Sequence, residues 1–171
     1  AAVRYRSGGV AYTREYLASY PDQVIAIRIA GDQPGQVSFR LRLSRGGQRY
    51  VDRLAAEDGG KLIMTAWNGG PAGIGACALV SVRAVGGSVG KLGEHVLVEG
   101  ADEAVILLTA ATTYRCEDPE AACRSYAAAA KGNQNRRRST RRFRVLPNAT
   151  PEGFALAPLG SLSPLIENAN N

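Results

Sequence analysis

Carboxylates are the residues of this chain best suited to catalysis, because two of them at a fixed separation can act as general acid and base. The chain has 15 Asp and Glu residues. Most are expected in turns or at a helix start, among them Asp32, Asp58, Asp102, Glu103, Asp118 and Glu120. Turn carboxylates are usually solvated loop residues. Glu15 lies on an expected strand, where we predict that it pairs with an arginine across the sheet. We therefore assign no catalytic residue.

Trp67, the single tryptophan, is the candidate carbohydrate-binding residue. It precedes the expected loop NGGPAG, and an indole on a loop rim can stack on the apolar face of a sugar and donate its N–H. The alternative is a packing role in the core or between sheets. For Tyr12, Tyr16 and Tyr20 we predict packing rather than a binding platform.

The cysteine and histidine content predicts no metal site. Cys77, Cys116 and Cys123 form an odd, small set, which argues against a disulfide framework. Cys116 and Cys123 flank an expected helix start, so a disulfide between them stays an open alternative. His95 is the only histidine, it has no nucleophile motif beside it, and we predict a structural role. Without a Cys-x-x-Cys motif, neither zinc nor another cofactor is predicted.

The net charge of +6 belongs to the end of the chain. Through Arg124 there are 14 basic and 13 acidic residues, whereas the remainder has 7 basic and 2 acidic residues. An arginine cluster accounts for most of this excess: Arg136, Arg137, Arg138, Arg141, Arg142 and Arg144. Such a cluster can bind phosphate backbones, but it has only Phe143 for stacking. A solvated tail is the competing interpretation.

Hydropathy gives no indication of a membrane span. The apolar run AVILLTAA (104–111) is far shorter than the roughly 20 residues that a membrane helix needs. No signal peptide is visible at the start, where the sequence already has the pattern of a strand and lacks an initiator Met. We therefore expect a chain that begins inside a longer protein. Secretion would require a signal peptide upstream.

Most of residues 1–116 alternate with a period of two, which predicts an antiparallel β-sandwich. In residues 36–45 the positions Val37, Phe39, Leu41 and Leu43 form a dry face. The linker GDQPG (31–35) predicts that this strand forms an antiparallel pair with residues 23–30. Further strands are expected at 10–19, 60–67, 73–85, 95–100 and 104–114. The last of these is apolar on both faces and is placed centrally.

After the strands, residues 117–132 have the signals of a helix. Asp118 is the expected N-cap, Pro119 the first helical residue and Gly132 the terminator. We interpret this segment as a linker helix that leaves the sandwich. Residues 133–171 contain several prolines and no sustained period, so an irregular, basic tail is expected.

Two blocks of the sequence resemble one enzyme family. YTREYLASYPDQVIAIRIAGDQPGQVSFRLRLSR (12–45) and GADEAVILLTAATTYRCEDPEAAC (100–123) are similar to the N-terminal β-sandwich domain of glycoside hydrolase family 95, the α-L-fucosidases and their relatives. The resemblance covers roughly residues 3 to 131. It implies a supersandwich-like fold whose last strand passes into a helix leading to a helical catalytic barrel.

The resemblance implies a function without catalysis in this chain. In the family the catalytic Glu, Asp and Asn residues belong to the barrel, which this sequence lacks, so we expect a truncated scaffold domain that is inactive alone. The parent reaction would be hydrolysis of terminal α-L-fucosides. The alternatives are a free-standing carbohydrate-binding module and, less favoured, a nucleic-acid binder acting through its basic tail. Exposed sheet edges would also favour a homo-oligomer.

Overall fold

The computed structural model describes residues 1–46, 50–69 and 72–137, with residues 131–137 described by their backbone alone. Strands dominate this part of the chain, and one helix follows them. The elements are β1 (Ala2–Ser7), β2 (Val10–Ser19), β3 (Val24–Gly31), β4 (Val37–Leu41), β5 (Val51–Glu57), β6 (Lys61–Asn68), β7 (Ile74–Val85), β8 (Ser88–Leu92), β9 (His95–Ala101), β10 (Glu103–Thr112) and α1 (Pro119–Arg137). The predicted mainly-β architecture is confirmed.

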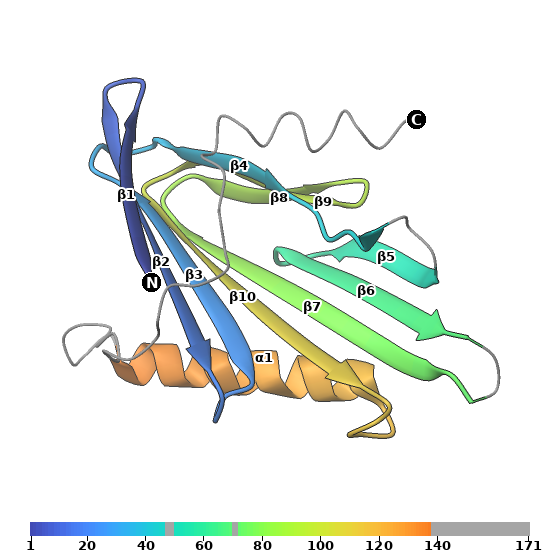
Figure 1. The fold of residues 1–171 in the computed structure, drawn as a ribbon. Helices are drawn as coiled ribbons and strands as arrows, with labels where there is room; N and C mark the ends of the chain where they lie inside the picture. Colours follow the sequence, from blue (N-terminus) through green and yellow to red (C-terminus); the bar gives the residue numbers. More distant parts are fainter. Residues whose placement is uncertain (47–49, 70–71, 138–171) are drawn as a thin grey trace.

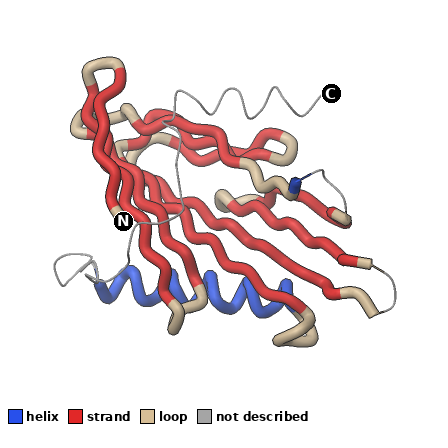
Figure 2. Tube along the Cα trace, viewed as in Figure 1, coloured by secondary structure: helices blue, strands red, loops and turns tan. Residues whose placement is uncertain are grey.

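The strands form two antiparallel sheets, shown in Figures 1 and 2. The large sheet has seven strands in the order β1-β2-β3-β10-β7-β6-β5, and the small sheet has the order β4-β9-β8. The small sheet covers one face of the large sheet, and α1 runs across the opposite face. Strand β10 is fourth of the seven, which confirms the central position predicted for residues 104–114.

Successive side chains along the strands of the large sheet point to opposite faces, one covered by the small sheet and the other by α1. On β7, Val80 and Val82 face the small sheet, whereas Cys77 and Leu79 face α1. The dry face predicted for residues 36–45 is confirmed, because Val37 is buried and the other three residues of that face pack against the same core.

The predicted hairpin of residues 23–30 with 36–45 is wrong. Strand β3 pairs with β2 and β10 in the large sheet, whereas β4 pairs with β9 in the small one. The linker therefore crosses from one sheet to the other. Gly35 adopts a φ of 71° within it and donates its N–H to the Asp102 carboxylate at 2.7 Å. Because β2 and β10 already occupy both edges of β3, β4 has no edge of β3 to join.

Three strand assignments differ from the sequence-based expectation. The opening segment is a hairpin, β1–β2, whose turn places Gly8 and Gly9 at positive φ, rather than one strand. Strands β5 and β8 were not predicted. Strand β5 has the sequence VDRLAAE, which contains a single β-branched residue, and β8 is short and includes a glycine. β5 is held as a strand by pairing with β6, and β8 by pairing with β9, although the strand propensity of both sequences is low.

Candidate functional site

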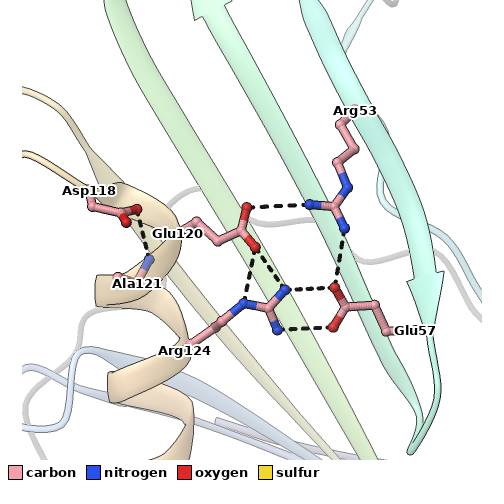
Figure 3. Close-up of polar contacts among 6 residues, drawn as sticks. All are labelled: Arg53, Glu57, Asp118, Glu120, Ala121 and Arg124. Atoms are coloured by element: carbon pink, nitrogen blue, oxygen red, sulfur yellow. Dashed lines mark hydrogen bonds and ion pairs between the residues drawn. The ribbon is translucent and has the colours of Figure 1, made fainter.

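Helix α1 begins where the sandwich ends, and its start is capped as the sequence predicts. The Asp118 carboxylate accepts a hydrogen bond from the backbone N–H of Ala121 at 2.9 Å (Figure 3). Pro119 is the first helical residue. The predicted end at Gly132 is wrong, because the helix continues to Arg137. An interior glycine costs a helix only about 1 kcal/mol, so it need not end one.

Arg124 ties the first turns of α1 to the edge strand β5. Its guanidinium donates to both carboxylate oxygens of Glu57, at 2.6 and 3.0 Å. It also contacts Glu120 of its own helix at 2.8 Å. Arg53 of β5 lies 3.4 Å from Glu57 and 3.4 Å from Glu120, which closes a four-membered network of alternating charge (Figure 3). We call Arg53, Glu57, Glu120 and Arg124 the helix anchor.

The electrostatics of the helix anchor suit attachment rather than proton transfer. Hydrogen bonds from Arg124 lower the pKa of the Glu57 carboxyl below its ordinary value of 4.5. Hydrogen bonds to Glu57 and Glu120 raise the pKa of Arg124. Glu57 therefore stays ionised at neutral pH, where a general acid must hold its proton. The anchor holds a helix to a strand edge.

Beneath the anchor, small side chains let α1 approach the sheet closely. Cys123, Ala127 and Ala130 form the buried stripe of the helix, at 0%, 5% and 4% exposure. The Thr109 hydroxyl lies 3.2 Å from the carbonyl oxygen of Cys123 and 3.4 Å from that of Leu79, so it bridges helix and sheet. The hydroxyl is buried and donates its one proton to these two acceptors in turn.

Sequence reasoning did not identify Thr109, Arg124 or Glu57. The i, i+4 spacing of Glu120 and Arg124 could have indicated the intrahelical pair. No local signal connects Arg124 with Glu57, because they are far apart in sequence and meet only when the helix packs on the sheet.

The remaining predicted acids also serve as structural contacts. Glu15 pairs with Arg28 on the neighbouring strand at 2.9 Å, which confirms its predicted role. Glu103 bonds the same arginine at 2.7 Å, and this hydrogen bond raises the pKa of Arg28. Asp32 accepts the backbone N–H of Ala11. The expectation that the turn carboxylates are solvated loop residues holds for Asp58, whose side chain is 91% exposed even though it pairs with Lys91.

Trp67 lies at the end of β6, on the same face of the large sheet as α1. Its ring packs over Gly75, its direct partner on β7, where an added Cβ would come within 2.8 Å of the indole. The residue is 42% exposed, so one side of the ring lies on the sheet while part of it meets solvent. The alternative of a packing role in the core or between the sheets is therefore wrong, because the residue is exposed and lies on the face away from the small sheet.

The tyrosines differ among themselves. Tyr12 packs against the core between the sheets and stacks on Tyr5, with ring centroids 5.3 Å apart, as predicted for a packing residue. Tyr16 is half-buried. Tyr20 is 81% exposed, so the packing role predicted for it is wrong.

His95 and the cysteines lie in separate places. His95 is the first residue of β9. All three cysteines are free, so the alternative of a disulfide between Cys116 and Cys123 is wrong for this structure. Cys123 instead points at β7, where its thiol lies 3.4 Å from the carbonyl oxygen of Cys77.

A polar hollow beside β5 holds two further acids. It is lined by Arg42, Val51, Asp52, Arg53, Leu54 and Glu94. Arg42 pairs with Glu94 at 3.0 Å, with 42% and 48% of these side chains exposed. An ion pair so accessible to water lacks the sheltered setting in which a carboxyl becomes a proton donor at neutral pH.

The described residues hold neither a metal-ligand cluster nor a membrane-spanning helix. Within residues 1–46, 50–69 and 72–137, no three His, Cys, Asp or Glu side chains gather in a way that could hold a metal ion. In that same part of the chain no helix has the length and apolarity to cross a membrane. Arg136 and Arg137 are the last two residues of α1, and only their backbone is described. The rest of the arginine cluster lies outside the described residues.

Comparison with known proteins identifies relatives of the sandwich. Residues 1–117 match the family model described as "Glycosyl hydrolase family 65, N-terminal domain". The chain is also 34% identical over 137 residues to "Alpha-L-fucosidase 2" of Arabidopsis thaliana. That alignment covers 67% of this chain and 16% of the relative, so the chain corresponds to a small part of that protein. Both matches agree with the resemblance to an α-L-fucosidase N-terminal sandwich, although the matching model is described under family 65 rather than family 95.

Proposed function

The chain belongs to the family of N-terminal domains described for glycosyl hydrolase family 65, and from this we propose that it is a non-catalytic scaffold domain of an α-L-fucosidase-like enzyme. The parent enzyme would hydrolyse terminal α-linked L-fucose from oligosaccharides. A helical catalytic barrel, which residues 1–46, 50–69 and 72–137 do not contain, would supply the acid and the base. The sandwich would pack against that barrel and support it.

The observation that carries this proposal is the firm attachment of α1 to the sandwich. The family match ends at residue 117, and α1 begins at Pro119. The helix is fixed at its start by Arg124 and Glu57 and beneath by its buried stripe. A helix held in this way transmits the orientation of the sandwich to whatever follows it. A loosely tethered module would not need such an anchor.

The outer face of α1 suits a close contact with another domain. Ala121, Ser125 and Ala128 recur along this face and are exposed. Small, uncharged side chains permit backbones to approach closely and cost little to desolvate. This face is therefore the surface against which we place the barrel.

Two measurements test the scaffold role. The purified chain should release no 4-nitrophenol from 4-nitrophenyl α-L-fucoside above a buffer control, while an active α-L-fucosidase does so under the same conditions. The reading frame downstream of this chain should encode a helical barrel with its own Glu, Asp and Asn residues. Turnover by the chain alone would refute a non-catalytic role, and a downstream sequence without a barrel would remove the scaffold's partner.

A carbohydrate-binding module is the second candidate, favoured by the position of Trp67. Its ring packs against Gly75 while the residue stays 42% exposed, so the ring could stack on a sugar. Calorimetric titration with fucosylated oligosaccharides should then give heat with the native chain and none with Trp67→Ala. Tyr20→Ala, which removes an exposed aromatic elsewhere, is the matched control. No heat with the native chain would end this candidate.

Self-association through a sheet edge is a further proposal. Strands β1 and β5 end the large sheet, and β4 and β8 end the small one. The unpaired backbone groups of such edges favour pairing with a second copy, whereas charged residues on these strands, such as Arg4, Arg6 and Lys91, limit it. Light scattering after gel filtration gives the mass directly, and a monomer at all concentrations would exclude edge pairing.

A further inference from the structure

Two buried thiols face each other across the interface between α1 and the large sheet. Cys77 lies within β7 and is 3% exposed, and Cys123 lies in α1 and is fully buried. The Cys123 thiol donates to the carbonyl oxygen of Cys77 at 3.4 Å. Both side chains belong to the same buried cluster between α1 and the large sheet. No disulfide joins α1 to β7 among the described residues.

The side chains that α1 packs against the sheet around this pair are small. A disulfide requires Cα atoms about 4.4 to 6.8 Å apart and β-carbons about 3.5 to 4.5 Å apart. Large side chains between a helix and a sheet would prevent such an approach. Here the buried stripe is Cys123, Ala127 and Ala130, and the single hydroxyl of Thr109 reaches carbonyl groups of both the helix and the sheet.

We propose that Cys77 and Cys123 are a disulfide-forming pair, which under oxidising conditions covalently joins helix α1 to strand β7. The oxidant is a small-molecule disulfide such as oxidised glutathione. One cysteine thiolate attacks it and forms a mixed disulfide, releasing one small thiol. The other cysteine then attacks the protein sulfur, which forms the Cys77–Cys123 bond and releases the second small thiol. Two protein thiols are oxidised and one small disulfide is reduced to two thiols.

Cys123 is the thiol that ionises first. The hydrogen bond from Cys77 lowers the pKa of Cys123, whereas the hydrogen bond with Cys123 and burial raise the pKa of Cys77. Because both thiols are buried, the first attack takes place when α1 is transiently released from the sheet. Once formed, the bond fixes α1 on the sandwich independently of the helix anchor.

Peptide mapping of the full chain tests this pairing directly. The chain is equilibrated with oxidised glutathione, its remaining thiols are alkylated with N-ethylmaleimide under denaturing conditions, and it is digested with trypsin. Cys77 then lies in the peptide of residues 62–83, and Cys116 and Cys123 share the peptide of residues 116–124. We expect these two peptides to be joined, and we expect the free 62–83 peptide to fall about tenfold or more relative to the reduced sample. Further cleavage after Glu117 should place the bond on Cys123 and the alkyl group on Cys116.

Variants provide matched controls. Cys116→Ser should leave the joined peptides unchanged, and Cys123→Ser should abolish them. Alkylation of both Cys77 and Cys123 in the oxidised sample would overturn the proposal. A bond within residues 116–124, or between Cys77 and Cys116, would overturn it equally. The mapping of the native chain decides the matter even if a variant fails to fold.

Discussion

Breaking the contact between Glu57 and Arg124 should weaken the attachment of α1 by a predictable amount. Charged hydrogen bonds contribute up to about 1.5 to 3 kcal/mol when sheltered, whereas exposed ion pairs contribute only about 0.2 to 1 kcal/mol. The Arg124 side chain is 38% exposed and that of Glu57 is 24% exposed, so solvent screens the pair substantially. The bidentate geometry places it at the upper end of the exposed range, and we expect a coupling free energy of about 1 kcal/mol.

A double-mutant cycle measures this coupling. The cycle comprises the native chain, Glu57→Gln, Arg124→Met and the double variant. Each is unfolded in urea at pH 7 and low salt, and unfolding is monitored by the fluorescence of the single tryptophan and by circular dichroism. The matched cycle uses Glu120→Gln, because Glu120 contacts the same arginine within the helix. That i, i+4 pair should couple by only about 0.3 to 0.5 kcal/mol.

The coupling should also depend on pH with a defined sign. The pKa of Glu57 is lowered in the folded state, so the unfolded chain binds its proton more readily. The contribution of the Glu57–Arg124 pair to the free energy of unfolding is therefore complete well above the ordinary pKa of 4.5, and it is lost as the pH falls through the lowered pKa of Glu57 in the folded state. A coupling no larger than that of the Glu120 cycle, or one that grows on acidification, would refute the role assigned to the anchor.

Three substitutions test other parts of the structure. Thr109→Val leaves two buried carbonyl groups without their shared donor and should lower the free energy of unfolding by about 1 to 3 kcal/mol, measured in urea. Gly75→Ala places a methyl group within 2.8 Å of the Trp67 ring and should change the tryptophan emission spectrum of the folded chain, whereas an unchanged spectrum would contradict the packing described. Leu62→Ala, at a fully buried position, should cost about 2 to 5 kcal/mol, and Leu92→Ala, 58% exposed, should cost far less.

The pattern along the chain was sufficient to predict strands but not which strands pair. Alternation from Val37 onward identified the dry face of β4, because burial on one side of a pleated strand has a period of two. The same alternation does not indicate which strand pairs with which. β3 and β4 lie next to each other in sequence and looked like a hairpin, yet β3 pairs with β10 from the end of the sandwich. The Pro and Gly residues of the linker indicate that the chain turns there. The sheet that β4 joins is decided by which strands already pair with both edges of β3.

In the functional site, too, local features could be predicted from the sequence and contacts between distant segments could not. Asp118 was recognisable as a cap because capping depends on residues within one turn of each other. No local signal indicates the contact of Cys123 with Cys77. Cys116 and Cys123 are close in sequence, but the helix places Cys123 against the sheet, beside Cys77.

By itself the sequence determined the mainly-β class, the central position of β10, the start of α1 and the pairing of Glu15 with an arginine. Those features depend on local periodicity, capping and the chemistry of neighbouring strands. Only the tertiary structure decided which strands form each sheet, the helix anchor and the meeting of Cys77 with Cys123. Each of these joins residues distant in sequence, and their contact exists only once the apolar faces of sheet and helix have been buried together.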